Sequence, residues 1–208
     1  MASPHPDAAQ HRLWLEFINT DAPPDGLDAL ASFGAYVDWL ERVGVLDGER
    51  GTTLQRRALL QPAGATAALL EARRMRSALR ALAERGPAED KPRAFALGEL
   101  NRVLGRSAGM RRIEQLGDGR FVRSFVTAGD AFAGLLVPLV ESATDSLVRG
   151  ELGRVRRCAG DRCDRVFYDA SKNGSRRWCA MGTCGNRAKA NRYRRRKRTR
   201  GLSDDGRR

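Results

Sequence analysis

All four cysteines of the 208-residue chain lie in one C-terminal stretch, where they form two evenly spaced pairs. Four residues separate Cys158 from Cys163, four separate Cys179 from Cys184, and fifteen lie between the pairs. A zinc site built from four thiolates needs four sulfurs converging on one ion, and two sequence-close pairs achieve this at little cost in loop entropy. The pattern predicts one zinc ion per chain, bound by these four residues, in a module that relies on the metal to fold.

Other uses of four cysteines stay open at this point. Two disulfides would suit a secreted protein, an iron–sulfur cluster also takes four cysteines, and the thiols need not act together at all. However, the N-terminus lacks the basic and long apolar segments of a secretory signal, and no apolar run approaches about 18 residues. We therefore expect a cytoplasmic protein without a membrane span. If zinc binds, four cysteine ligands leave no open position for catalysis.

The positive charge of the chain is concentrated in the same region. The formal net charge is +13, and residues 151–208 alone hold 19 Lys or Arg against six Asp or Glu. Residues 1–150 hold 19 of each kind and are neutral. A GC-rich genome would explain the preference for arginine over lysine, but it would not explain this clustering. A neutral body with a strongly basic end is typical of proteins that bind a polyanion.

The residues after Cys184 suit a helix, because Ala, Arg and Lys are frequent there and proline is absent. Helical spacing places Arg187, Asn191, Arg194 or Arg195, and Arg198 on one face, which can follow phosphates or enter a major groove. The alternative is a solvated basic tail. The candidate nucleic-acid contacts are Arg176, Arg177, Arg187, Lys189, Asn191, Arg194, Arg195 and Arg198. DNA is the expected partner and RNA the runner-up, because phosphate contacts carry no sequence information.

The rest of the chain has mostly helical periodicity. We predict a short helix over 13–20, helices within 27–44, 47–60, 65–85 and 95–104, a β-hairpin around 117–119, and a buried helix over 131–148 kinked at Pro138. The fold class is mainly α with one small hairpin. Residues 1–10 are expected to be a disordered lead-in, 11–150 a helical domain, 151–200 a zinc finger with its basic helix, and 201–208 a tail.

Two segments resemble known families. The stretch 176–189, RRWCAMGTCGNRAK, closely resembles the CGNR zinc finger of bacterial regulators, which is named after the tetrapeptide at 184–187. The upstream cysteine pair and the spacing of Phe167, Asp169, Ser171 and Asn173 are also similar. Residues 13–20, LWLEFINT, are similar to the opening motif of the ABATE domain, in which an acidic residue and Asn-Thr recur. That family is labelled "putative stress-induced transcription regulator".

The resemblance implies one zinc bound by the four cysteines and a DNA-binding role in bacterial transcription. The first hypothesis is thus a zinc-dependent transcriptional regulator at the nucleoid, whose helical domain forms a homodimer, senses a small-molecule effector, or both. Glu16, Asn19 and Thr20 are candidates for a ligand pocket, although helix capping beside the core would also explain them. An RNA- or ribosome-associated zinc protein is the alternative. An enzyme is not expected, because no acid–base or nucleophile set is recognisable.

Overall fold

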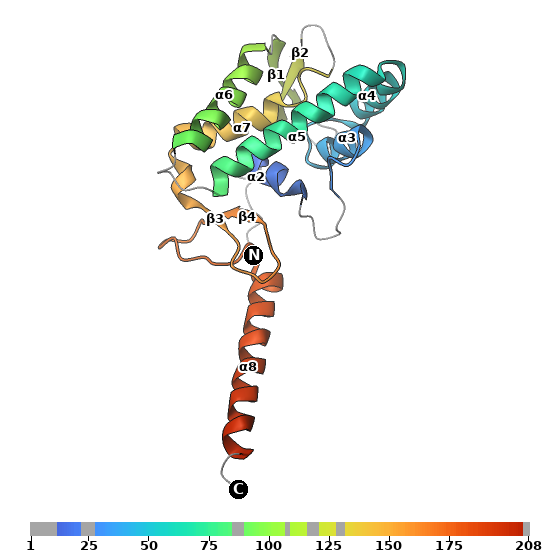
Figure 1. Cartoon of the computed structure of the whole chain (residues 1–208). Coiled ribbons are helices and arrows are strands. Elements are labelled where there is room, and N and C mark those ends of the chain that lie inside the picture. Colours follow the sequence, from blue (N-terminus) through green and yellow to red (C-terminus); the bar gives the residue numbers. More distant parts are fainter. Residues whose placement is uncertain are drawn as a thin grey trace. The chain divides into compact units, whose positions relative to one another are not determined.

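The computed structural model describes residues 12–21, 28–84, 90–106, 109–115, 121–127 and 132–205 (Figure 1). By its internal contacts the chain divides into two compact units, Met1–Gly153 and Arg154–Arg208. The first unit contains most of the helices and one β-hairpin, and the second contains the cysteines and the basic helix. The predicted lead-in at 1–10 lies outside the described residues.

The described helices of the N-terminal unit cover most of its length, with one antiparallel hairpin between the last two, so the mainly α fold is confirmed. Strand β1 pairs with β2 in a register that sets Gly109 opposite Thr127 and Gln115 opposite Phe121. The turn predicted at 117–119 lies outside the described residues. The elements are α2 (Leu13–Ile18), the 3₁₀ turn η1 (Asn19–Asp21), α3 (Phe33–Arg42), α4 (Gly48–Leu60), α5 (Pro62–Glu84), α6 (Asp90–Arg106), β1 (Gly109–Gln115), β2 (Phe121–Thr127) and α7 (Val137–Val148).

The short helix α2 contacts both α5 and α7. Trp14, Phe17 and Ile18 are at most 1 % exposed, so both sides of the helix pack against other elements. The indole Nε1 of Trp14 donates a hydrogen bond of 3.0 Å to Ser146 Oγ on α7. Because a buried indole N–H needs a partner, this bond fixes α2 against a helix more than a hundred residues later in the chain.

Local capping decides where several helices begin and end. Helix α3 begins at Phe33 because the Ser32 side chain accepts from the Ala35 N–H at 3.1 Å, so the apolar pattern from residue 27 overestimated its length. Asp47 caps α4 in the same way, accepting from the Arg50 N–H at 2.8 Å. Gly44, the predicted stop, has a φ of 75°, a left-handed conformation that glycine adopts without strain.

The predicted kink at Pro138 is wrong. Helix α7 begins at Val137, so Pro138 lies in its first turn, and Leu135 and Leu136 precede the helix. Proline is favoured in a first turn because the N–H that it lacks would have no intrahelical acceptor there. The same residue that was expected to bend a long helix instead marks the start of a shorter one.

The C-terminal unit has little regular structure before its long final helix. Strands β3 (Val155–Arg157) and β4 (Val166–Tyr168) pair antiparallel, with Val155 opposite Tyr168. The 3₁₀ turn η2 (Glu151–Arg154) precedes β3, and a π-helical turn, η3 (Met181–Gly185), leads into helix α8 (Asn186–Asp205). The basic helix is therefore confirmed, and β4 lies between the two cysteine pairs. The sequence did not predict β3.

Candidate metal centre and basic helix

The first cysteine pair lies in the turn between β3 and β4. The Cys158 N–H donates to the Arg165 carbonyl at 2.9 Å, and the Cys163 N–H donates to the Gly160 carbonyl at 3.1 Å. Arg162, between them, has a φ of 58°, the one described non-glycine residue in the left-handed region. This tight turn brings the two side chains of the pair to the same side of the hairpin.

The second pair is carried by a loop and by the turn that starts the basic helix. The Ala159 N–H donates to the Arg177 carbonyl at 2.8 Å, which ties the loop before Cys179 to the first cysteine turn. Cys184 lies in η3 and is buried, with 6 % of its surface exposed. Because η3 continues directly into α8, the position of Cys184 also fixes the first turn of the helix.

The four sulfur atoms all lie within 4.8 Å of one another. Cys179 Sγ is 3.8 Å from Cys163 Sγ and 3.8 Å from Cys184 Sγ. Four sulfurs placed tetrahedrally about 2.3 Å from a zinc ion would be about 3.8 Å apart, so the residues fit a single zinc ion. Zinc held here by Cys158, Cys163, Cys179 and Cys184 would supply structural cross-linking, because all four positions belong to the protein.

The same distances decide against the other uses of these cysteines. All four thiols are free, and 3.8 Å is far beyond the 2.05 Å of a disulfide bond. Iron–sulfur clusters divide their four cysteines between two or four iron atoms, which would spread the four sulfurs more widely than the 4.8 Å found here. Four convergent sulfurs are also incompatible with unrelated thiols. The predicted cofactor, one zinc ion per chain, is the one that this geometry supports.

Backbone donors around Cys158 favour its thiolate. The N–H groups of Gly160 and Cys179 both point at Cys158 Sγ at 3.4 Å. Burial by itself would raise the pKa of Cys158, but these donors outweigh it and hold the pKa below the ordinary value. Burial and the neighbouring sulfurs raise the pKa of Cys179 to about 12. A metal ion is therefore needed to keep all four sulfurs deprotonated near neutral pH.

A buried carboxylate, Asp169, organises the loop between the pairs. Its side chain accepts from the Ser171 hydroxyl at 2.5 Å, from the Ser171 N–H at 2.9 Å and from the Arg176 N–H at 3.0 Å. The Ser171 hydroxyl bond, opposed by burial and aided by the two backbone bonds, holds the pKa of Asp169 below its usual range. The sequence analysis used the spacing of Asp169 and its neighbours within 167–173 only as part of the family resemblance, and it did not predict that Asp169 organises this loop.

Two predicted nucleic-acid contacts have roles inside this unit. The Arg176 guanidinium donates to the carbonyls of Trp178 and Cys179 and lies over the Phe167 ring, with its Cζ 4.9 Å from the centroid. Arg177 lies over Trp178 at 5.6 Å. Trp178 is half-buried and packs against Phe167 and the cysteines, so it belongs to the small apolar cluster around the metal centre. Arg176 thus supports the loop that carries Cys179.

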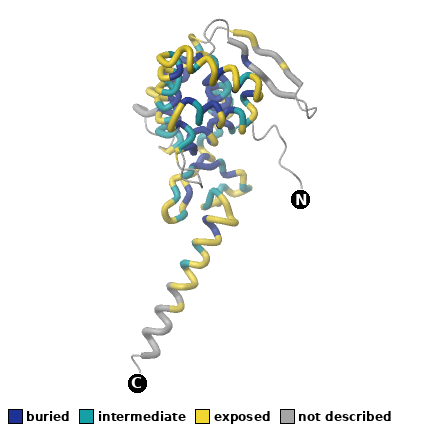
Figure 2. The backbone as a smooth tube through the Cα atoms, turned by 90° about the vertical axis from the view of Figure 1, so that its right-hand side faces the viewer, coloured by how far each residue is buried: buried dark blue, intermediate teal, exposed yellow. Residues whose placement is uncertain are grey.

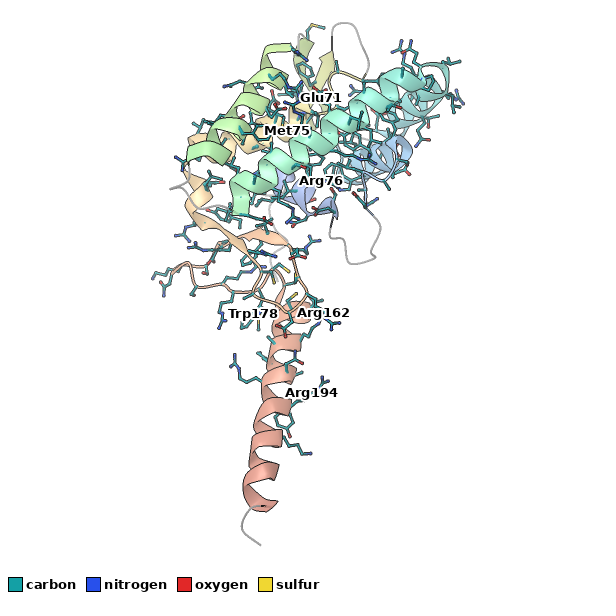
Figure 3. The ribbon with its side chains drawn as sticks, viewed as in Figure 1. Glu71, Met75, Arg76, Arg162, Trp178 and Arg194 are labelled. Carbon is teal, nitrogen blue, oxygen red and sulfur yellow. The ribbon has the colours of Figure 1, made fainter. Side chains whose placement is uncertain are left out.

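On α8, the structure separates residues that helical spacing had grouped. The Asn191 side chain donates from Nδ2 to Asp161 Oδ2 at 3.2 Å, which links the helix to the first cysteine turn. Arg187, Lys189 and Arg194 are exposed, and Arg194 extends from the side of the helix (Figure 3). The side chains of Arg195 and Arg198 lie outside the described ones.

The three residues proposed for a ligand pocket have structural contacts. Asn19 Nδ2 donates to the Leu15 carbonyl and Thr20 Oγ1 to the Phe17 carbonyl, both at 2.7 Å, which closes the end of α2. Arg76 of α5 (Figure 3) donates to Thr20 Oγ1 at 3.0 Å. Asn19 and Thr20 are each 5 % exposed, whereas Glu16 is on the surface. The described contacts favour capping beside the core for Asn19 and Thr20.

Comparison with known families agrees with both resemblances. Residues 11–150, more than half of the chain, match the family named ABATE, which is described as "Putative stress-induced transcription regulator". The chain belongs to the ABATE family. Residues 154–197 match the CGNR zinc finger, so the family match covers the four cysteines and the first half of α8. No curated protein matches the ABATE chain. Within its described part, no helix has the length and apolarity needed to cross a membrane.

Proposed function

We propose that this ABATE protein is a zinc-dependent, DNA-binding transcription regulator. The observation that carries the proposal is the direct connection of the metal centre to the basic helix. Cys184 lies in η3, and α8 begins at the next residue but one, so the zinc that holds the sulfur also fixes the orientation of the helix relative to the finger. A metal-fixed helix can present its cations in one direction, as recognition helices do.

The charge and length of α8 suit a nucleic-acid duplex. The helix has 20 residues, about 30 Å at 1.5 Å per residue, and nine of its residues between 187 and 200 are Lys or Arg. Like charges at helical spacing destabilise an isolated helix. Phosphates would neutralise them, so binding and helix formation would stabilise each other. The described part of α8 is mostly exposed, which leaves these cations accessible (Figure 2).

The contacts of Asn191 shift the proposed DNA-facing side of the helix. Ala188 and Asn191 are both half-buried, and Asn191 donates a hydrogen bond to Asp161 of the first cysteine turn. At 3.6 residues per turn, Lys189, Tyr193 and Lys197 lie on a different side, and all three are exposed. Tyr193 is 70 % exposed, between two cations of the same stripe. We expect this stripe, with Arg187 and Arg194 along one of its edges, to contact DNA before Asn191 does.

The N-terminal unit supplies the regulatory part of the proposal. Residues 1–150 carry no net charge, so this unit has no general attraction to phosphate. Its membership of a family described as transcription regulators supports a sensing or dimerising role. We place the protein at the nucleoid of a bacterial cell, where stress would change its occupancy of target promoters. The zinc is structural in this scheme, and the protein is not an enzyme.

A genome-wide capture of bound nucleic acid tests the proposal. The full chain, zinc-loaded, is cross-linked in cells alongside Cys179→Ser, which removes a ligand, and Thr183→Ser, an equally small change at an exposed position of the same turn. A limited set of DNA sites that Thr183→Ser retains and Cys179→Ser loses is the expected result. Recovery of ribosomal RNA alone would overturn the regulator in favour of an RNA-associated protein.

A further inference from the structure

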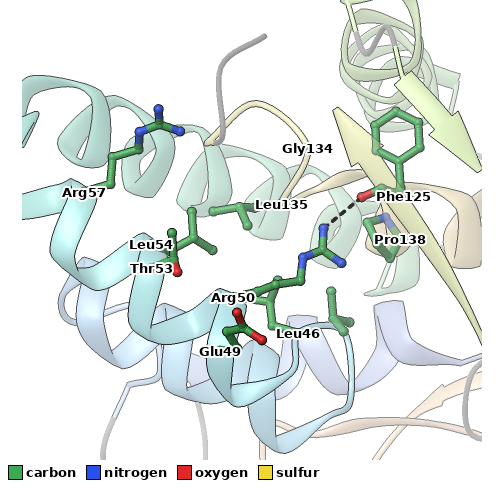
Figure 4. Close-up of a pocket in the computed structure, with 11 residues that line it drawn as sticks. Leu46, Glu49, Arg50, Thr53, Leu54, Arg57, Phe125, Gly134, Leu135 and Pro138 are labelled. Atoms are coloured by element: carbon green, nitrogen blue, oxygen red, sulfur yellow. Dashed lines mark hydrogen bonds between the residues drawn. The ribbon is translucent and has the colours of Figure 1, made fainter. Parts of the chain in front are cut away.

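A second candidate site lies in the N-terminal unit, away from the residues that the sequence singled out. One face of α4, the end of β2 and the segment just before α7 enclose a pocket of about 230 Å³ (Figure 4). The α4 residues that line it recur at spacings of three and four, as expected for one side of a helix: Glu49, Arg50, Thr53, Leu54 and Arg57. Concave sites of this kind are the default locations for small ligands.

The floor of the pocket is apolar. Leu46, Leu54 and Leu135 line it and are 8 %, 6 % and 5 % exposed, and Pro138 closes one side. Leu54 comes from α4, whereas Leu135 and Pro138 come from the chain that enters α7. Side chains from two distant parts of the sequence therefore form one apolar surface that a small hydrocarbon or aromatic group would cover.

The positively charged side chain of Arg50 lines the pocket beside this apolar surface. The Arg50 guanidinium donates from Nη2 to the Phe125 carbonyl at 3.3 Å, and this is its one hydrogen bond within the described part of the chain. At 3.3 Å the bond is slightly longer than a typical N–H···O hydrogen bond, and it uses one of the five N–H donors of the guanidinium. A carboxylate accepts two parallel bonds from a guanidinium and binds it more strongly than a neutral carbonyl does.

The remaining polar lining agrees with an anionic ligand. Arg57, two helical turns after Arg50, adds a second cation, and Thr53 between them offers a hydroxyl; Glu49 is the one acidic residue of the lining. Two arginines against one glutamate leave the pocket net positive. Residues 1–150 as a whole carry no net charge, so this excess of positive charge is local to the pocket.

We propose that this pocket binds a small amphipathic monocarboxylic acid, with its carboxylate on Arg50 and its apolar part against Leu54, Leu135 and Pro138. This site would be where the effector sensing proposed above takes place. Binding of the acid does not depend on the proposed function, whereas an effect of binding on transcription does. The site accounts for ligand sensing without Glu16, Asn19 or Thr20, none of which is among its lining residues.

Isothermal titration of the zinc-loaded full chain, without DNA, tests the site with benzoate and its neutral isostere benzamide, and with hexanoate as a second acid. We expect at least one of the two acids to bind, and benzoate to bind about tenfold or more tightly than benzamide, because a hydrogen bond to a charged group is stronger than a neutral one. Arg50→Gln should remove this difference. Arg56→Gln is the matched control, since Arg56 is exposed on the same helix and does not line the pocket.

A second variant keeps the test independent of any effect of Arg50 on folding. Thr53→Phe keeps both arginines, places a ring in the pocket from an exposed helix position, and should abolish binding of both acids. Failure of both acids to bind at about 10 mM, equal affinity for benzoate and benzamide, or unchanged binding by Arg50→Gln or Thr53→Phe would each overturn the proposal. Because no DNA is present, failure of DNA binding would not change these results.

Discussion

The folds of the two units are stabilised by different interactions, an apolar core in the N-terminal unit and a metal centre in the C-terminal unit. The N-terminal unit fully buries large apolar side chains, including Trp14, Tyr36 and Phe17. In the C-terminal unit, the buried apolar positions of the described residues are Val155, Cys158, Val166, Phe167 and Cys184. Two of these five are metal ligands. A core of three other side chains is too small to offset chain entropy, so the metal must supply most of the stability there.

Charge separates the units in the same way. The net charge of +13 falls entirely within residues 151–208, where self-repulsion opposes compactness. Residues 1–150, which have an apolar core and no net charge, need no counter-ion. Under the proposed function, the basic unit would be stabilised by both the zinc and the phosphates of DNA, so its folding and its binding would be coupled.

Removal of zinc should have the largest effect, and it should affect one unit only. Structural zinc contributes about 10–16 kcal/mol of binding free energy to small modules, which here is folding free energy. With excess chelator, or in Cys179→Ser, we expect residues 154–205 to become accessible to trypsin at their many arginines. The N-terminal unit should stay protected. Mass spectrometry of a timed digestion measures both.

Thr183→Ser in the same turn is the control for that digestion and should match the wild type. If chelation exposed the N-terminal unit as rapidly as the finger, the two units would share one cooperative unfolding transition. The contrast drawn between an apolar core and a metal-held module would then be wrong.

A core substitution in the N-terminal unit should give the opposite pattern. Met75 of α5 (Figure 3) has no exposed surface, and Met75→Ala should cost about 2–5 kcal/mol through lost burial and a residual cavity. Leu70→Ala, on the same helix but 56 % exposed, should cost well under half as much. Calorimetric melting measures the stability of each variant, and metal analysis measures its zinc content, which should stay at one zinc per chain in both variants. Loss of zinc from Met75→Ala would show that the finger depends on the domain.

The metal centre was predictable because its information is local. The cysteine spacings alone pointed to the ligand set, and the run of Ala, Arg and Lys after Cys184 was enough to predict α8. In the N-terminal unit, apolar periodicity located the helices, while cap residues set their ends. The role of Pro138 was missed because the sequence does not say whether a proline lies inside a helix or in its first turn. Only the packing of Leu135 and Leu136 outside α7 decides that.

Contacts between distant segments were beyond the sequence. The hydrogen bond from Asn191 to Asp161 joins residues thirty positions apart, and helical spacing alone could not reveal it. The sequence analysis therefore placed Asn191 on the side expected to face DNA, whereas in the fold Asn191 contacts the first cysteine turn. Thr20 looked available for a ligand because its bond from Arg76 comes from another helix. The pocket beside Arg50 combines α4, β2 and the start of α7, and no single stretch of sequence contains its pattern.

A methyl group beside the sulfurs should weaken zinc binding measurably. A Cβ at Gly160 would lie 3.1 Å from Cys184 Cβ, 3.2 Å from Cys184 Sγ and 3.4 Å from Cys158 Sγ. Metal-bound sulfurs have little freedom to move away, so Gly160→Ala should lower zinc affinity by about 10–100-fold, the range typical of substitutions around metal ligands. Competition with a chromogenic chelator measures it. Gly182→Ala, where a Cβ meets nothing within 4 Å, is the matched control and should change affinity little.

The smallest expected effect concerns the backbone of the first cysteine turn, and it measures how much strain the metal holds. Arg162 is exposed and has a φ of 58°, a conformation that costs a non-glycine residue about 1–2 kcal/mol. Arg162→Gly removes that cost, but the greater entropy of the unfolded chain destabilises the fold by a similar free energy. The guanidinium concentration at which zinc is released should therefore change little. Arg162→Val should release zinc at lower denaturant, because a β-branched side chain fits this region worst. Equal midpoints for the glycine and valine variants would mean that the turn relaxes around the zinc, and that the metal, more than the backbone, determines its shape.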